Sequence, residues 1–284
     1  MIMTAGEMKP RQSDGVLPES LAPLRPLVVD DLVRVGNPHD GGYILPGRVI
    51  SRVGCLLSFG VNDDWTFEQD FLRRNPGCII HAYDHTVSER HFRRQTRKAF
   101  ERCLRLKSGS YARLKQSWQT YHDYREFFSS NRVHYVERIF NRIEGDNDAT
   151  IEKVFSRLNG TSQVAVKMDI EGGEYRVIHP LLQYEGRIDL LVIEFHETDP
   201  LRRTFLDCVE QLMTGYQIVH LHGNNGGGAA ADGLPEILEI TFLSKRFKLP
   251  PVYRGDLPLQ GIDSPNFPQK PDFNLKFNPE TLRD

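Results

Sequence analysis

The sequence predicts an α/β fold: a Rossmann-like, seven-stranded sheet, parallel except for an antiparallel closing hairpin, with helices on both faces. Two observations indicate this fold. From Val53 onward, short apolar runs alternate with amphipathic helical stretches, and several runs are apolar throughout, as strands covered on both faces are. The last two runs are joined by a glycine-rich loop instead of a helix, which predicts the closing hairpin.

Seven runs have the length and composition of strands. They cover residues 53–59, 78–83, 133–140, 164–168, 189–195, 216–221 and 236–243. Helical patterns lie between them. Thr66 and Gln69 match a Thr-x-x-Gln capping box at the start of one helix. Two further helices are predicted by apolar residues on one side: Phe92, Ala99, Phe100 and Cys103 in the first, and Phe205, Cys208, Val209 and Leu212 in the second.

The chain divides into four segments by composition. We expect a flexible N-terminal arm over residues 1–20, a short cap over 21–50, the main domain over 51–247 and an irregular, Pro-rich tail over 248–284. The tail is expected to wrap the surface without adding to the core. A chain of 284 residues suffices for one large domain with decorated ends.

Composition and charge narrow the class of protein. Apolar residues make up 39% and charged residues 26%, as in soluble globular proteins, and the net charge of -2 gives no global attraction to nucleic acid or acidic membranes. The four cysteines include no CxxC pair, so they predict small buried side chains in a reducing compartment. No signal-peptide core or membrane-spanning run is visible, so the expected location is the cytoplasm.

Polar residues after the first two strands of the main domain predict a nucleoside site. Gly60, Val61 and Asn62 follow the first strand, directly after its Ser58, and Asp84 ends the second, directly before His85. In an open α/β sheet, ligands collect at the carboxyl ends of the strands. A glycine there lets the backbone approach a ligand, and a carboxylate 24 residues beyond Gly60 is placed to bind a ribose diol.

Two common nucleotide-binding classes lack their motifs here. The loop after the first strand, GVNDD at 60–64, is not a GxGxxG turn, which argues against NAD, because a pyrophosphate needs close backbone approach. No GxxxxGK[ST] motif exists, so a P-loop ATPase is excluded. Alone, Gly60 could simply end a strand and Asp84 could be an exposed loop carboxylate.

The fourth strand and its neighbours resemble the FkbM family of methyltransferases. The string VKMDIEGGEYRVI (166–178) closely resembles the family's signature, in which a strand ends in K-[IM]-D-[IV]-E-G. Other stretches fall in the family's order: VRVGNPHDGGYIL (33–45), LLSFGVNDDWTFEQDF (56–71), TIEKVF (150–155), LLVIEFHE (190–197), LHGNN (221–225) and LPEILEITF (234–242). The resemblance extends from about Val33 to about Leu243, and the DIEG element is its most specific part.

The resemblance implies a class I methyltransferase that transfers a methyl group from S-adenosylmethionine. Methyl transfer to a hydroxyl requires alignment of donor and acceptor and removal of a proton. Asp169 and Glu171 lie two residues apart at the end of the strand, so in extended geometry they share a face, one toward the cofactor and one toward the acceptor. Lys167 should point the same way as Asp169. The alternative is that Glu171 and Glu174 only favour the start of the next helix.

Glu194 and His196 end the fifth strand with the same spacing and are candidates for a base or an acceptor-binding pair. His196 could equally be structural. His220 and His222 follow at the end of the sixth strand, and with Asp169, Glu194 and His196 they could form a divalent-metal site of nitrogen and oxygen ligands. A metal dependence therefore stays open at this point.

The acceptor is the least determined part. We expect O-methylation of a hydroxyl on a sugar, a glycan or a related small molecule. Residues 90–107 hold eight Lys or Arg and one Glu, which indicates a solvated helix face or a cationic rim for an anionic acceptor. Two alternatives remain: a nucleic-acid methyltransferase that uses this helix, and a catalytically silent Rossmann-like binding module with a glycine-poor loop. Nothing in the sequence predicts the oligomeric state.

Overall fold

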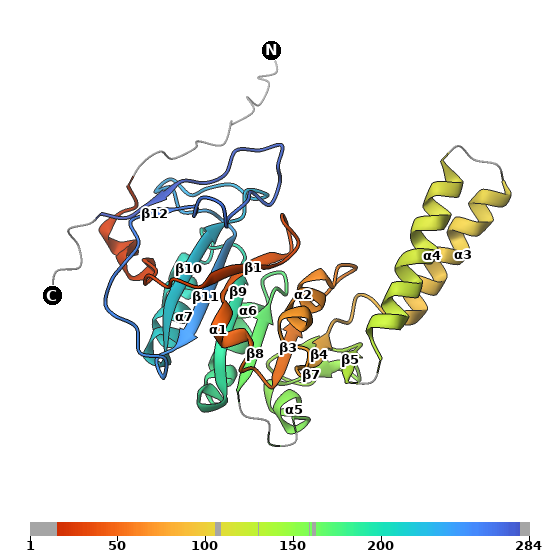
Figure 1. The fold of residues 1–284 in the computed structure, drawn as a ribbon, viewed down its shortest axis with the longest axis horizontal. Coiled ribbons are helices and arrows are strands. Elements are labelled where there is room, and N and C mark those ends of the chain that lie inside the picture. The colour runs from red at the N-terminus through yellow and green to blue at the C-terminus, as the bar shows by residue number, and fades with distance from the viewer. Residues whose placement is uncertain (1–15, 106–108, 130, 159, 161–162, 279–284) are drawn as a thin grey trace, which may run out of the picture.

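The computed structural model describes residues 16–105, 109–129, 131–158, 160 and 163–278. Seven strands form the central sheet: β3 (Cys55–Phe59), β4 (Ile79–Tyr83), β5 (Arg132–Tyr135), β8 (Val164–Met168), β9 (Ile188–Phe195), β10 (Tyr216–Gly223) and β11 (Leu238–Ser244). Their order is β10-β11-β9-β8-β3-β4-β5 (Figure 1). All neighbours are parallel except β11, which is antiparallel to both β9 and β10. The predicted sheet with its closing hairpin is confirmed.

The predicted third strand is shorter than expected. The run 133–140 divides into β5 and a separate short strand, β6 (Arg138–Ile139), which pairs with β7 (Asp148–Ala149) in a sheet of its own. The division falls at Glu137, whose amide donates to the carbonyl of Tyr135 in a tight turn. The Glu137 carboxylate also accepts two hydrogen bonds from Arg157, so a charged side chain is held where an edge strand would have continued.

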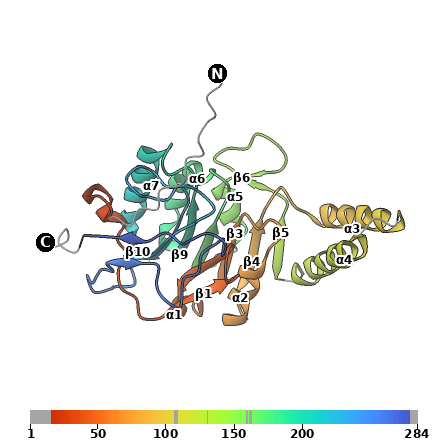
Figure 2. The same cartoon turned by 90° about the horizontal axis from the view of Figure 1, so that it is seen from above.

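Helices cover both faces of the sheet (Figure 2). They are α1 (Gly47–Ile50), α2 (Thr66–Arg74), α3 (Glu89–Leu104), α4 (Ser110–Phe127), α5 (Ile151–Ser156), α6 (Glu174–Leu182) and α7 (Arg202–Gly215). Because side chains alternate along a strand, β3 supplies Leu57 to the core under α5, α6 and α7, and Leu56 to the core under α1 and α2. The four residues predicted to line one side of α7 are all buried.

Both chain ends pack more closely than the sequence suggested. Residues 1–15 of the predicted arm lie outside the described residues, but Leu17 is buried and its amide donates to the carbonyl of Lys276. The cap forms a hairpin of β1 (Leu32–Gly36) and β2 (Gly42–Pro46). The tail carries β12 (Asp256–Leu257) and β13 (Leu275–Lys276) and contributes Leu257, Leu275 and Phe277 to the core. The expectation of a tail without core residues is therefore wrong.

Two helix details also differ from the sequence-based expectations. The capping box at Thr66 does not form: Thr66 lies inside α2, and its backbone N–H is capped by the side chain of Asp64 at 2.9 Å. In α3, Phe92 and Ala99 are buried, but Phe100 is exposed. The reason is that α3 and α4 form a hairpin that projects away from the sheet, so its far end has no domain surface to cover (Figures 1 and 2).

Within the described residues, no helix is both long enough and apolar enough to cross a lipid bilayer.

The cap of α2 gives a direct test of this local structure. Asp64→Ala should lower the free energy of unfolding by about 1 kcal/mol, because it removes the acceptor for the first helical N–H. Thr66→Ala should leave stability unchanged or raise it slightly, since the Thr66 hydroxyl is buried and has no partner among the described residues. Urea unfolding of the two variants would measure these free energies. A larger loss of stability for Thr66→Ala than for Asp64→Ala would mean that Thr66 forms the predicted capping box after all.

Candidate functional site

A cleft of about 810 Å³ opens at the carboxyl ends of β3, β4 and β8. Its size lies within the range of roughly 300–1,000 Å³ that small-molecule sites occupy. Six of the seven predicted cofactor residues line it, namely Gly60, Val61, Asn62, Asp84, His85 and Asp169, and so does the catalytic candidate Glu171. Ser58 does not: it is buried beneath the cleft, where its hydroxyl donates to Glu68 at 2.5 Å.

The turn at Gly60 can be made only by glycine. Its φ is +80°, and a Cβ built on it would lie 1.7 Å from the carbonyl oxygen of Asp169. The ends of β3 and β8 are therefore in backbone contact. Lys167 strengthens this junction, because its buried ammonium donates to the Gly60 carbonyl at 2.5 Å and lies 3.5 Å from the Asp169 carboxylate. The expected common direction of Lys167 and Asp169 matches this geometry.

Asp84 holds the other side of the turn. One carboxylate oxygen accepts the backbone N–H groups of Val61 and Asn62 at 3.0 and 2.7 Å, and the other accepts the backbone and hydroxyl of Thr86. Burial alone would raise the pKa of Asp84, but the hydrogen bonds from Thr86, Asn62 and Val61 lower it below its ordinary value. Asp84 is thus a buried carboxylate whose ionised form is favoured, rather than the exposed loop carboxylate that the sequence left open.

Strained backbone gathers at this edge of the sheet. Four described residues other than glycine have positive φ, and three of them, Asn62, Glu171 and Glu197, follow β3, β8 and β9. All three line the cleft. Such conformations cost about 1–3 kcal/mol each and persist where the surrounding structure enforces them, which is common at functional sites.

Tyr43 and Glu194 form the floor of a polar cluster beside the cleft. The Tyr43 hydroxyl donates to Glu194 at 2.9 Å and lies 3.2 Å from Asp169, while the amide of Asn224 donates to the second Glu194 oxygen at 2.9 Å. Glu194 is buried, and its burial together with the charges of Asp169 and Glu239 raises its pKa well above the usual range. Burial and the same carboxylates raise the pKa of Tyr43.

His196 lies in the middle of the carboxylates. Its Nε2 is 3.6 Å from Glu171, 3.8 Å from Glu194 and 3.9 Å from Asp169, and its Nδ1 lies 3.2 Å from the fully buried Glu174. Burial alone would lower the pKa of His196, but Glu174 and then Glu194 and Asp169 raise it to about 9. His196 is therefore protonated at neutral pH, which does not suit the general-base role considered for it from the sequence.

Asp169 and Glu171 reach the same histidine by a route that the sequence did not predict. The strand β8 ends at Met168, and Glu171 has φ +54°, so the extended geometry that would place both on one face does not apply. Asp169 is half-buried in the cleft, whereas the Glu171 side chain is 88% exposed. Glu174 does more than favour a helix start, because it also accepts the backbone N–H groups of Ile170 and Gly172.

The larger metal site suggested by the sequence does not form. His220 binds Asp263 at 3.1 Å, and the two nitrogens of His222 bind Glu239 and Asp272 at 3.3 and 3.2 Å, so their ring nitrogens face carboxylates elsewhere. The spacing in the sequence gave no sign of these partners, two of which come from the C-terminal tail.

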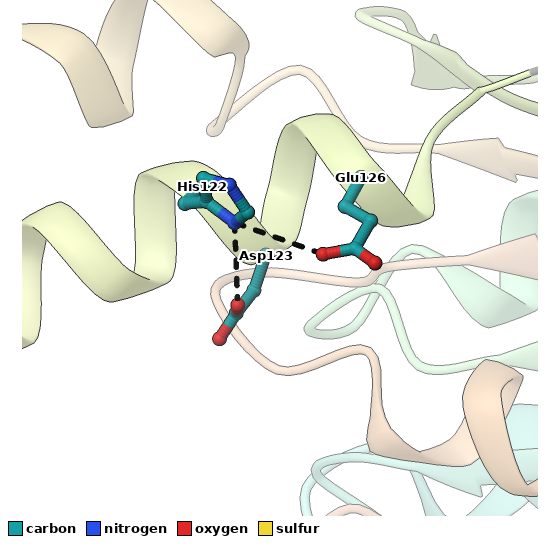
Figure 3. A group of neighbouring side chains, drawn as sticks. All are labelled: His122, Asp123 and Glu126. Carbon is teal, nitrogen blue, oxygen red and sulfur yellow. Dashed lines mark ion pairs between the residues drawn. The ribbon is translucent and has the colours of Figure 1, made fainter.

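Two groups of described side chains have ligand atoms close enough to share a metal ion. The first is Asp169, Glu171 and His196, where an ion would have to replace the proton that His196 holds. The second, His122, Asp123 and Glu126, lies on the exposed surface of α4 (Figure 3), and we assign no metal to it.

Several residues of the site were missed by sequence reasoning. Tyr43 and Asn224 contact Glu194, and Glu68 is buried beside Lys167 and bonded to Ser58. Tyr43 and Asn224 stood in stretches noted only for their family resemblance, DGGY and LHGNN. The available signal was weak: Tyr43 follows the pair Gly41 and Gly42, and Asn224 follows the single glycine Gly223.

Known proteins resemble this chain in structure only distantly. No protein-family model matches the chain, and no curated protein matches it. Similar solved structures include a putative tRNA (m1A22) methyltransferase from Streptococcus pneumoniae in complex with S-adenosyl-L-methionine (14% identity, 72% of each chain, TM-score 0.35). A second example is a putative caffeoyl-CoA O-methyltransferase from Staphylococcus aureus (11% identity, 70% of this chain and 80% of that chain, TM-score 0.34). A third is the Methanococcus jannaschii fibrillarin pre-rRNA processing protein (11% identity, 69% of this chain and 68% of that chain, TM-score 0.34).

The close contact at Gly60 predicts that Gly60→Ala destabilises the protein more than Gly172→Ala does. Gly60→Ala should lower the free energy of unfolding by more than about 3 kcal/mol, because its Cβ would overlap the Asp169 carbonyl oxygen. Gly172→Ala should cost only about 1 kcal/mol, since Gly172 also has positive φ but its Cβ would meet nothing within 4 Å. Equal losses in chemical denaturation would contradict the close approach of the two strand ends.

The buried contacts of His222 with Glu239 and Asp272 predict that the stability of the protein depends on pH. Burial alone would lower the pKa of His222, but Asp272 and Glu239 raise it to about 10, above the unfolded value of 6.5. The stabilisation is therefore fully present below pH 6.5 and is lost as the pH rises toward 10, about 5 kcal/mol in all. Thermal unfolding of wild type and His222→Gln should differ most at low pH and converge at high pH. The exposed His122→Gln should follow wild type throughout.

Proposed function

We propose that this protein is an S-adenosylmethionine-dependent methyltransferase that acts on a hydroxyl of a sugar, a glycan or a related small molecule. The observation that carries the proposal is the cleft itself: a glycine-only turn at Gly60, a fixed carboxylate at Asp84 and the Asp169 carboxylate beside Lys167 meet at the carboxyl ends of β3, β4 and β8. The resemblance of residues 166–178 to the FkbM signature supports the same activity.

The charge of the cleft favours a cationic cofactor over a polyphosphate. Nine carboxylates and three Lys or Arg side chains line it; the carboxylates are Asp40, Asp63, Asp64, Glu68, Asp84, Glu137, Asp169, Glu171 and Glu197, and the cations are Arg138, Lys167 and Arg176. S-adenosylmethionine carries a sulfonium and an ammonium against one carboxylate, whereas NAD and ATP bring several negative charges into the same space. The apolar side chains of Ile139, Phe140 and Ile170 offer a lining for its adenine ring.

Different residues at the cleft would bind the cofactor, accept the proton and orient the acceptor. Gly60, Val61 and Asn62 would face the methionine part of the cofactor, and Asp84 the ribose, with His85 beside it. When bound, the cofactor supplies a methyl group on a positively charged sulfur. Asp169, half-buried and held by Lys167 and Tyr43, is placed to accept the proton of the acceptor hydroxyl. The protonated His196 and the exposed Glu171 would orient the acceptor.

The first test is a calorimetric titration with S-adenosylhomocysteine. Wild type should bind with micromolar affinity, and Asp84→Ala should lose at least about tenfold, because the carboxylate that fixes the turn is gone. Asp207→Ala, a surface carboxylate on α7, is the matched control and should bind like wild type. Absence of binding to a folded wild-type protein would exclude the methyltransferase and leave a silent binding module.

The second half of the test concerns the acceptor. With cofactor binding established, sugars with free hydroxyls should be screened for methylation, with and without divalent metal, beside Asp169→Asn. We expect this variant to keep cofactor affinity and to lose about 10²–10⁴-fold in rate, as removal of a general base does. Methylation of oligonucleotides instead of sugars would favour the nucleic-acid alternative, against which the acidity of the cleft argues.

A further inference from the structure

The α3–α4 hairpin is a projection with its own surface. Its two helices are antiparallel and pack against each other, and both views show them extending away from the sheet (Figures 1 and 2). At the root, residues 89–92 and 119–127, the aromatic rings of Phe92 and Tyr124 are buried against Trp65. The outer hairpin, residues 93–105 and 109–118, extends from that anchor; a helix of the length of α3 spans about 24 Å.

Large apolar side chains are exposed on the outer hairpin. Phe100 is 51% exposed, Leu104 68%, Tyr111 73% and Trp118 58%. Phe100, Tyr111 and Trp118 line a shallow groove between the two helices, together with Arg93, Arg97 and Lys115. The other exposed large apolar side chains among the described residues are scattered over the rest of the chain, whereas these four share one element. Clustered exposure of this kind marks an interaction surface.

The charge along the hairpin is strongly graded. The outer hairpin carries eight Lys or Arg and one Glu, a formal charge of +7. The root carries two Arg and three carboxylates, a formal charge of -1, including the exposed group of Asp123 and Glu126 around His122 (Figure 3). The positive charge is therefore concentrated toward the tip, away from the acidic cleft.

We propose that the outer hairpin is a peripheral anchor that binds the surface of an anionic lipid bilayer. Basic residues on a helix are attracted to anionic headgroups, and Trp, Phe and Leu side chains insert at the boundary with the acyl chains. The outer hairpin supplies both kinds of residue on one element, and the acidic root lies on the side away from the bilayer. This inference goes beyond the proposed methyl transfer and does not depend on it.

The outer hairpin is less suited to bind a second copy of itself, a nucleic acid or an acidic polysaccharide. A second copy of this hairpin would meet it with the same charge of +7, which opposes pairing. A nucleic acid or an acidic polysaccharide would pair with the arginines, and a nucleobase could stack on Trp118, but neither has a use for the exposed aliphatic Leu104 near the tip. A bilayer buries Leu104 and Phe100 while the cations stay with the headgroups.

The full chain offers its own probe for the test. It contains two tryptophans, of which Trp65 is buried and Trp118 is exposed on the outer hairpin. Protein should be mixed with vesicles of phosphatidylcholine, with or without phosphatidylglycerol, and followed by cosedimentation and by tryptophan emission. We expect sedimentation with the anionic vesicles only, with a blue shift of the emission and quenching by brominated acyl chains. Trp118→Phe should lose the shift, because Trp65 is already buried.

Two pairs of variants separate the apolar and the charged contributions. Phe100→Ser/Leu104→Ser should weaken vesicle binding about tenfold or more, since it removes the inserted side chains. Arg97→Gln/Lys98→Gln should weaken it about 30-fold at low salt, because two cations no longer attract the headgroups. The matched controls, Val252→Ser for an exposed apolar residue and Arg142→Gln/Arg203→Gln for two exposed charges, should bind like wild type. Circular dichroism would verify that each variant is folded.

Three results would overturn the proposal. The first is equal or no binding of the folded wild type to neutral and anionic vesicles. The second is vesicle binding that the four hairpin substitutions do not change. The third is binding that depends on Arg97 and Lys98 but leaves the Trp118 emission unshifted, together with tight binding to heparin or single-stranded RNA; the hairpin would then be a polyanion site.

Discussion

The carbonyl oxygen of Asp169 lies against the backbone of Gly60, and the cleft depends on this contact between the ends of two adjacent strands. Because no side chain fits between them, the turn after β3 and the carboxylate after β8 are held at a fixed distance. Lys167 joins the same junction from below, with its ammonium on the Gly60 carbonyl and close to Asp169. A cofactor seated on the turn and a base at Asp169 would therefore be aligned by the sheet itself, as methyl transfer in line requires.

The second constraint is electrostatic. Carboxylates outnumber cations in the cleft. Beside it, burial and the charges of Asp169 and Glu239 raise the pKa of Glu194, and neighbouring carboxylates raise the pKa of His196 to about 9. Lys167 remains charged because Asp169, Glu68 and Glu194 together outweigh its burial and raise its pKa. A positively charged ligand in this cleft would lower the cost of keeping the same carboxylates ionised, so ligand binding and proton release are coupled there.

The fold followed from the sequence more closely than the site did. The strand 164–168 was predicted with its observed bounds, because four of its five residues are apolar, as is typical of a buried parallel strand. The helix α4 was not predicted, since its apolar residues form no single stripe and one side of it covers only α3. Tyr43 was missed because it lies 126 positions from Asp169, and no local pattern reports such a contact.

The partners of His220 and His222 also could not be predicted from the sequence. His220 and His222 were correctly placed at the end of a strand, but their carboxylate partners come from β11 and from the tail, at distances along the chain that no motif encodes. Residue types and strand ends are local properties and can be read from the sequence. Which two side chains finally neutralise each other depends on the path of the tail across the sheet.

That path has a consequence for biosynthesis. His222 lies in a strand at the edge of the sheet, yet one of its two counter-ions, Asp272, is synthesised 50 residues later. Leu275 and Phe277, which belong to the same core as Leu221 of that strand, are synthesised later still. A nascent chain that stops short of these residues would hold a charged imidazole with half its compensation and an open hydrophobic surface. The closing strands therefore reach their final packing only after the tail has been synthesised, and until then they stay exposed to chaperones.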